Sequence, residues 1–319
     1  MSSIIKKIRH QFRPLRVRYE HFLGIHFPKK LANIRYKQFH GKDIDWEHPK
    51  NIDEKISWMK FYGDTSEWPR LADKYQVRQY VEERGLGDML VPLYGKWDRA
   101  EDIEWESLPN QFVMKTNHGS KTILICKDKQ TLDIPAWIRQ FNEWLHTDYS
   151  SIHGETHYRS IKPCIIAEQL LDVEKQPVKS SSLIDYKIWS FDGKPFCIWC
   201  CLNRTPKTVD VITYDTDWNP HPEYSVSTSH YRLTNVRLPR LASLDRMLDA
   251  AARLSKGHPQ VRVDLYEVDG KPYFGEMTFT SSSGVNSFYT EDFLLELGSQ
   301  VKLPAKSDKR NNLTKKKKK

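Results

Sequence analysis

The chain has 319 residues, of which 39% are hydrophobic and 12% aromatic, and its formal net charge is +9. This composition supports one large domain or a few lobes that share a core, and it excludes a disordered chain. No run of 18 apolar residues occurs, and the basic start MSSIIKKIRHQF has no long apolar stretch. Neither a transmembrane helix nor a secretory signal is therefore predicted.

The positive charge is concentrated at the two ends of the chain. Residues 305–319 carry a net charge of +7 and residues 1–19 a net charge of +6, which leaves −4 for residues 20–304. A mildly acidic body argues against a face that binds nucleic acid. The basic ends either contact an anionic membrane surface or are solvated tails, and the sequence leaves both interpretations open.

The predicted elements form three regions and a tail. Residues 1–85 are expected to be mostly helical, with helical spacing over 73–84, and residues 305–319 form a basic, disordered tail. Strands are predicted at 89–94, 111–115, 123–126 and 164–167 in a region 86–170, and at 185–191, 196–202, 261–266 and 273–279 in a region 171–304. Helices are expected at 135–145 and 241–254. Hairpins without regular βαβ alternation indicate an α+β chain with antiparallel sheets.

Three of the five cysteines lie close together in FCIWCCLN, at Cys197, Cys200 and Cys201. The CxxC spacing invites a zinc or redox site. The apolar neighbours instead favour a buried strand in which cysteine acts as a small hydrophobic residue. Nothing demands an oxidising compartment, so we expect a cytoplasmic protein.

The most informative pair of residues is Asp264 and Glu276, on adjacent strands of one predicted hairpin around the Asp269-Gly270 turn. Two carboxylates that face each other across strands repel unless a cation lies between them. Mg²⁺ suits this position because it binds through one or two carboxylates together with substrate phosphates. The alternative is a pair of exposed acids on a strand face. Arg262 is expected on the same face, where it either stabilises charge on transferring oxygens or forms a salt bridge with one of the acids.

A second feature is Lys115, which is followed by the polar turn TNHGSKT. A lysine at a strand end before such a turn can place a cation and free N–H groups against phosphates, although the spacing of a Walker A loop is absent. Lys74 and Lys187 are further candidates for phosphate binding, and His118 for an acid or base. Solvated lysines and ordinary turn residues are the alternatives.

Taken in order, the segments ADKYQVRQYV, LPNQFVMKTNHGS, IKPCIIAEQLL, DYKIWSFDGKP and VRVDLYEVDGKPYFGEMTFTSSSG resemble the TupA-like ATP-grasp family. They span residues 71–284, and their joint order is more specific than any one of them. The resemblance implies an ATP-grasp fold, with two α+β lobes clasping ATP after a mostly helical N-terminal segment. The region 86–170 would be the lid lobe, and the region 171–304 the C-terminal lobe with the metal site.

The resemblance also implies roles for individual residues. Phosphates and the rest of the nucleotide would be bound by Lys74, Lys115, Gly119, Ser120, Glu168, Gln169, Leu170 and Glu174, with the last of these toward the ribose. Arg262 and Lys187 would be catalytic. Asp264 and Glu276 would bind Mg²⁺ together with Thr278, which stands where many ATP-grasp enzymes have asparagine. Thr278 therefore puts a second metal in question, though not the first.

The implied function is an ATP- and Mg²⁺-dependent carboxylate–amine ligase that acts through an acyl phosphate. The resemblance points to an acidic sugar or other small-molecule or glycan carboxylate, joined to an amino acid or peptide amine in surface-polysaccharide biosynthesis. One alternative is a glycosyltransferase that uses a sugar nucleotide, for which Asp215-Thr216-Asp217 would be the DxD motif. Another is a binding module that has lost catalysis.

Overall fold

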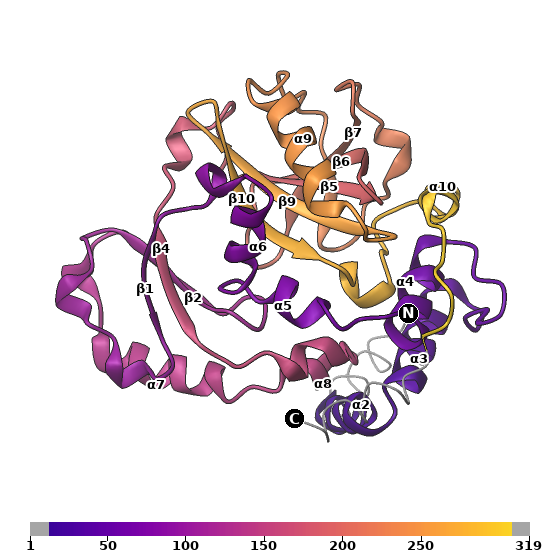
Figure 1. The fold of residues 1–319 in the computed structure, drawn as a ribbon, viewed down its shortest axis with the longest axis horizontal. Helices are drawn as coiled ribbons and strands as arrows, with labels where there is room; N and C mark the ends of the chain where they lie inside the picture. The colour runs from indigo at the N-terminus through magenta and orange to yellow at the C-terminus, as the bar shows by residue number, and fades with distance from the viewer. Residues whose placement is uncertain (1–12, 308–319) are drawn as a thin grey trace, which may run out of the picture.

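The computed structural model describes residues 13–307 and contains a four-stranded sheet and a six-stranded sheet, each flanked by helices (Figure 1). The four-stranded sheet lies toward one end of the molecule, and the six-stranded sheet forms the larger lobe above it in Figure 1. The predicted α+β class, with a mostly helical start, is confirmed.

The four-stranded sheet has the order β1-β4-β2-β3 and is antiparallel throughout. Its strands are β1 (Leu93–Trp97), β4 (Ile165–Gln169), β2 (Phe112–Thr116) and β3 (Ile123–Cys126). Phe112 and Met114 on one face are buried in a core with Phe141 of α7 (Ile134–Leu145). Because side chains alternate along a strand, the other face presents Val113 and Lys115.

The six-stranded sheet has the order β10-β9-β5-β6-β7-β8 and is antiparallel except for the parallel pair β7 and β8. Its strands are β5 (Asp185–Phe191), β6 (Lys194–Leu202), β7 (Val209–Asp215), β8 (Tyr231–Leu233), β9 (Val261–Val268) and β10 (Lys271–Thr278). Helix α9 (Leu244–Ser255) contacts β5, β6 and β9 and contributes to the main core. Cys197, Cys200 and Cys201 are buried in this sheet as expected.

The N-terminal region contains α2 (Arg13–His26), α3 (Pro28–His40), α4 (Ile52–Tyr62), α5 (Trp68–Ala72) and α6 (Val77–Glu83). Asn51 and Glu54 form a capping box that fixes the start of α4. Later helices are α8 (Tyr149–His153) and α10 (Glu291–Gln300), and α10 packs against α4. Within residues 13–307, no helix has the length and apolarity needed to cross a membrane.

Two of the element predictions are wrong in their bounds. The strand expected at 89–94 begins only at Leu93, and a short 3₁₀ segment (Gly87–Met89) precedes it. The helix expected over 73–84 begins at Val77, because the Asp73 carboxylate accepts the backbone N–H groups of Tyr75 and Gln76 and holds a turn there. The boundaries at residues 85, 170 and 304 stay predictions, and most of the expected basic tail lies outside the described residues.

Candidate functional site

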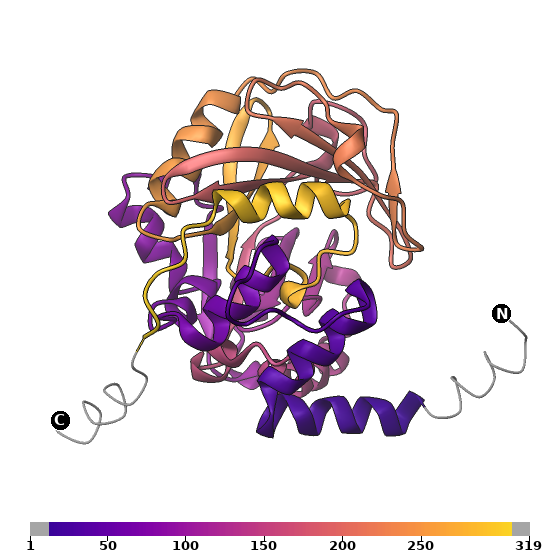
Figure 2. The same ribbon diagram turned by 90° about the vertical axis from the view of Figure 1, so that its right-hand side faces the viewer.

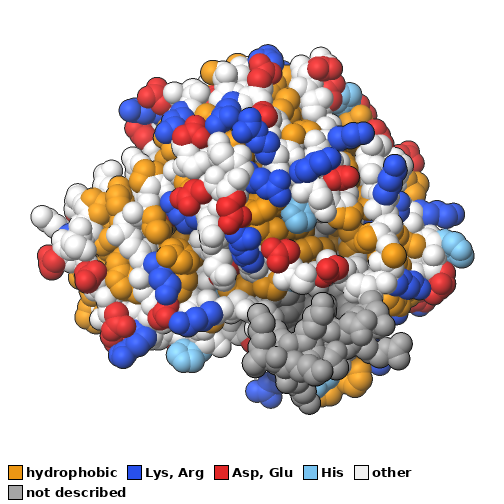
Figure 3. Space-filling model, viewed as in Figure 1, with side chains coloured by type: hydrophobic (Ala, Val, Ile, Leu, Met, Phe, Trp, Pro, Cys, Tyr) orange, Lys and Arg blue, Asp and Glu red, His pale blue; other side chains and the backbone are white. Residues whose placement is uncertain are grey.

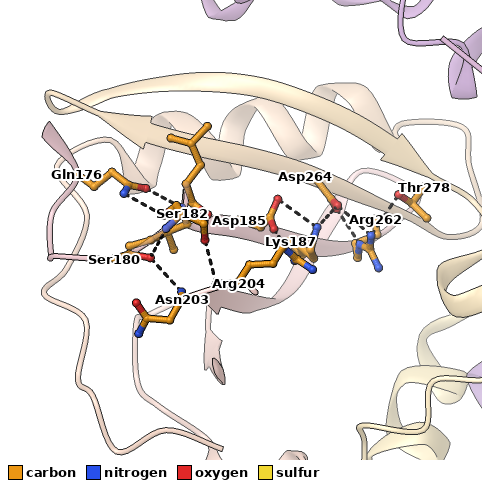
Figure 4. A network of polar contacts seen from close by, with 12 residues as sticks. Gln176, Ser180, Ser182, Asp185, Lys187, Asn203, Arg204, Arg262, Asp264 and Thr278 are labelled. Carbon is orange, nitrogen blue, oxygen red and sulfur yellow. Dashed lines mark hydrogen bonds and ion pairs between the residues drawn. The ribbon is translucent and has the colours of Figure 1, made fainter. Parts of the chain in front are cut away.

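Asp264 is the centre of a buried ionic cluster on the six-stranded sheet (Figure 4). Arg262 donates from Nε to Asp264 Oδ1 at 2.7 Å and from Nη2 to Oδ2 at 2.9 Å. Lys187 on β5, whose backbone pairs with that of Asp264, also donates to Oδ2. The salt bridge considered for Arg262 therefore exists, and three predicted site residues meet in one place.

The opposite charges in this cluster stabilise the ionised forms of their partners, although the groups are buried. Burial would raise the pKa of Asp264, but Arg262 and Lys187 outweigh it and hold that pKa below its usual value. Burial would likewise lower the pKa of Lys187, yet Asp185 and Asp264 raise it above the usual range for lysine. Asp185 lies 3.4 Å from Lys187 Nζ. Asp264 and Lys187 are thus both ionised at neutral pH.

Glu276 on β10 pairs with Asp264 across the β9–β10 ladder, as the hairpin predicts. Its side chain is 40% exposed, and Lys74 Nζ lies 3.7 Å from Oε2. Lys74 also donates to the backbone oxygen of Gly119 at 2.6 Å. Burial lowers the pKa of Lys74. One lysine thus touches both the glycine turn of the small lobe and the acidic hairpin of the large lobe.

Lys115 and Glu168 form a second ionic group on the open face of the four-stranded sheet. Lys115 Nζ lies 2.7 Å from Glu168 Oε2. Arg78 of α6 donates to the other carboxylate oxygen at 3.1 Å. Arg78 follows Lys74 by four residues, so helical spacing was the signal that could have found it. Figure 3 shows that Lys, Arg, Asp and Glu side chains mingle over the middle of this face of the molecule, while hydrophobic side chains gather at one end.

The turn after β2 is held from both sides. The Asn117 side chain accepts the N–H of Cys164 at 2.7 Å and donates to the Lys162 carbonyl at 2.9 Å. A Cβ on Gly119 would lie 3.0 Å from the Tyr149 ring, so the turn packs closely there. Ser120 is exposed, and its hydroxyl contacts the Tyr149 hydroxyl.

The remaining nucleotide candidates follow β4. Gln169 ends the strand, and its N–H donates to Pro92 O at 2.9 Å. Leu170 is half-buried, and Glu174 is exposed on the 3₁₀ segment Val173–Lys175. Among residues 13–307, the structure gives the Glu174 side chain no polar contact that joins it to the ionic clusters. Its role stays a prediction.

The sequence did not reveal a buried relay behind Arg262. Arg262 Nη1 donates to Ser281 Oγ at 2.8 Å, and that hydroxyl donates to Asn286 Oδ1 at 2.6 Å. Asn286 Nδ2 in turn donates to Asp53 Oδ1 at 2.6 Å. His40 Nε2 lies 3.1 Å from the other oxygen of Asp53. The relay links Arg262 to Asp53 on α4, which is 233 residues away from Asn286 in sequence, and it holds the arginine in its orientation.

The acidic pair fits one Mg²⁺ by its donor chemistry. The Glu276 carboxylate is partly exposed. The Asp264 carboxylate accepts three hydrogen bonds from Arg262 and Lys187, so about one of its four lone-pair positions is left for a metal ion. Thr278 Oγ1 already accepts from Arg262 Nη2 at 3.3 Å. Across the described part of the chain, no group of three or more His, Cys, Asp or Glu is placed to bind a metal by itself. Phosphates would have to complete the coordination.

The DxD triplet of the glycosyltransferase alternative lies away from these clusters, at the end of β7. The Asp215 carboxylate accepts from Asn219 backbone N–H at 2.7 Å and from its side chain at 2.9 Å, so it stabilises a turn. His221 also lies 3.3 Å from it. These contacts are typical of a turn and need no ligand to account for them.

Comparison with known proteins found distant likenesses among solved structures and one matching family model. Solved structures similar to it include an L-amino acid ligase from Bacillus licheniformis (13% identity, TM-score 0.45, 82% of this chain and 57% of that one). They also include a D-alanine–D-alanine ligase from Bacillus anthracis with ATP (14% identity, TM-score 0.40, 79% and 69%). No curated protein is a significant match.

These structural likenesses are distant, with TM-scores below 0.5, so the assignment depends on the family comparison. The family model described as TupA-like ATPgrasp matches residues 54–302, which is most of the chain and includes every residue of the two ionic clusters. The chain therefore belongs to the TupA-like ATP-grasp family.

Proposed function

We propose that this ATP-grasp ligase joins the carboxylate of an acidic sugar to the amine of an amino acid or peptide, with ATP and Mg²⁺, in bacterial surface-polysaccharide biosynthesis. The observation that carries the proposal is the pairing of Asp264 and Glu276 across one hairpin, with Lys187 and Arg262 bound to the first acid and Lys74 near the second. Such a site suits phosphoryl transfer, which depends on positioning and charge neutralisation.

The residues would divide the work as follows. Lys74 and Lys115 bind phosphate oxygens from the side of the small lobe, and Lys187 binds from the large lobe. A carboxylate oxygen of the substrate attacks the γ-phosphorus, the bond to the β-phosphate oxygen breaks, and ADP and an acyl phosphate form. The amine nitrogen then attacks the acyl carbon, phosphate leaves, the nitrogen gives up a proton to solvent, and an amide forms. Arg262 stabilises negative charge on the acyl oxygen, and its relay through Ser281 keeps it oriented.

Asp264 and Glu276 would hold the metal, with Thr278 beside them. Mg²⁺ would neutralise charge on the β- and γ-phosphate oxygens when bound. Thr278 remains engaged by Arg262, so the structure supports one such ion better than two.

A cavity next to the 3₁₀ segment Ser281–Gly284 supports an anionic substrate that carries hydroxyl groups. The cavity has a volume of about 320 Å³, and Arg16, Arg35, Ser282 and Ser283 are among its lining residues. Ser282 and Ser283 follow directly after Ser281, which accepts from Arg262. The two arginines could bind a carboxylate, and the serine hydroxyls could form hydrogen bonds with sugar hydroxyls. Ser281, which orients Arg262, is next in sequence to the lining residue Ser282. We expect the enzyme in the cytoplasm, where the basic ends of the chain would attract it to the anionic inner face of the membrane.

The first test is a thermal-shift panel with ATP, ADP, UDP and UDP-sugars in the presence of Mg²⁺, for the wild type and Lys115→Ala. Binding to the folded state contributes about 2.7 kcal/mol at 100 times the dissociation constant, which is readily measured. We expect a shift with ATP and ADP that Lys115→Ala abolishes. Lys127→Ala is the matched control, because Lys127 is exposed in the same lobe and its side chain is not part of the ionic clusters.

Turnover is tested next as release of ADP and phosphate when glucuronate or galacturonate and an amino acid are supplied together. Neutral glucose and galactose, which lack the carboxylate, should give no product. A shift with UDP compounds alone would contradict the ligase proposal and direct attention to Asp215 and Asp217. A nucleotide shift without turnover on any acidic sugar would retain the fold assignment and exclude this substrate class.

A further inference from the structure

Helix α2 exposes a continuous hydrophobic stripe. Leu15, Tyr19 and Phe22 are spaced by four and three residues, and they are 60%, 52% and 49% exposed. Phe27, which is 53% exposed, extends the stripe at the start of α3, with its ring 6.0 Å from that of Phe22. Side chains three and four apart lie on one side of a helix, so these residues form a single apolar face.

The sides of α2 that carry Leu23 and Gly24 are packed inward, and Gly24 is fixed against α8. Leu23 is 2% exposed, and a Cβ on Gly24 would lie only 1.8 Å from the backbone oxygen of Ser151. Ser151 also contacts His21 Nδ1 at 2.9 Å. Only glycine permits such close approach, so the helix cannot rotate to bury its stripe without losing this contact. Figure 2 shows α2 along the lower edge of the molecule, with its N-terminal end reaching beyond the rest of the described fold.

Basic residues accompany the stripe. Arg18 lies between its members, and Lys29 and Lys30 follow Phe27. The sequence before α2 continues the same three- and four-residue spacing with Ile5, Ile8 and Phe12. Residues 1–19 contain six Lys and Arg and no acid, for a net charge of +6. Two copies of such a segment would repel each other, whereas an anionic lipid surface attracts it.

We propose that α2 lies in the plane of an anionic membrane surface, with Leu15, Tyr19, Phe22 and Phe27 inserted at the boundary between headgroups and acyl chains. A helix with aromatic and aliphatic residues on one side and arginine and lysine beside them has the character of an interfacial anchor. The partner is therefore a bilayer that contains anionic phospholipid. The two ionic clusters lie on other elements. Arg16 of α2 also lines the substrate cavity proposed above, so membrane binding is measured without substrate.

The experiment is co-sedimentation of the full chain with large vesicles of phosphatidylcholine alone or mixed with phosphatidylglycerol. We expect binding to the mixed vesicles that weakens at high salt, and little binding to the neutral ones. Leu15→Glu should lower the vesicle partition coefficient by about tenfold or more. Val17→Glu is the matched control. Val17 is 58% exposed, carries the same change of charge, and points to the other side of the helix at roughly 200° from Leu15.

Three results would overturn the proposal. In the first, the wild type stays in the supernatant with anionic vesicles. In the second, Leu15→Glu and Val17→Glu lose binding equally, which would mean that the change of charge, and not the loss of the apolar stripe, weakens binding. The third is a dimer in sedimentation velocity that Leu15→Glu dissociates, which would assign the stripe to a second copy. Unchanged melting temperatures of both variants with Mg²⁺ and ADP would show that the fold and nucleotide site are intact.

Discussion

The two acids proposed to bind Mg²⁺ differ in how the protein holds them, and substitution should separate them. Asp264 is 1% exposed and accepts charged hydrogen bonds from Arg262 and Lys187. Asp264→Asn leaves two buried cations opposite a neutral amide, and breaking a buried pair in this way costs about 3–5 kcal/mol. Glu276 is 40% exposed, with Lys74 at 3.7 Å, so Glu276→Gln should cost less than about 1 kcal/mol.

The assay is chemical unfolding of both variants in EDTA without nucleotide, followed by a thermal-shift titration with Mg²⁺ and ATP. We expect Asp264→Asn to lose a large part of a total stability of about 5–15 kcal/mol, and Glu276→Gln to unfold like the wild type. Both should lose the Mg²⁺-dependent part of the ATP shift. Equal destabilisation of the two variants, or a neutral effect of Asp264→Asn, would refute this division of roles.

Three further predictions concern other parts of the molecule. Asn286→Ala breaks the relay behind Arg262, so kcat should fall by at least about tenfold while the ADP thermal shift is retained, and steady-state kinetics measure this. Gly119→Ala brings a Cβ to 3.0 Å from the Tyr149 ring, so KM for ATP should rise several-fold with little change in melting temperature. Burial lowers the pKa of His157 to about 3. Below pH 6.5 the unfolded chain therefore binds a proton that the folded chain does not, and between pH 7 and pH 5 stability falls by about 2 kcal/mol from this group. His157→Phe should reduce that loss in urea midpoints, and an unchanged pH slope would contradict the assignment.

The sequence was sufficient to predict the acidic hairpin, because alternation along each strand and the Asp269-Gly270 turn restrict the register. It could not predict the bulge at Gly275, where a Cβ would lie 2.9 Å from the Asp264 backbone oxygen. That irregularity brings Glu276 opposite Asp264. The start of α6 at Val77, four residues later than expected, also escaped prediction, since hydrogen bonds to the Asp73 side chain compete locally with the helix.

Contacts between distant segments were beyond reach for a different reason. The relay joins Asn286 to Asp53, and no local pattern marks a polar pair 233 residues apart. Arg78 could have been found from the helical spacing expected over residues 73–84, but its partner Glu168 lies on β4, 90 residues away in sequence. Local rules therefore recovered the strands that carry the chemistry, whereas the groups that orient those side chains depend on tertiary packing.

Each candidate lysine lies beside a carboxylate in the absence of nucleotide. Lys115 is paired with Glu168, Lys187 with Asp264, and Lys74 lies near Glu276. A buried lysine alone would lose its proton, and Lys187 keeps its charge because Asp185 and Asp264 outweigh burial. If these lysines bind ATP as proposed, the same carboxylates would compete with phosphate oxygens for them, which would lower ATP affinity in the absence of metal. A metal ion that engages Asp264 and Glu276 would withdraw two of these competitors, so nucleotide and Mg²⁺ should each bind more tightly in the presence of the other.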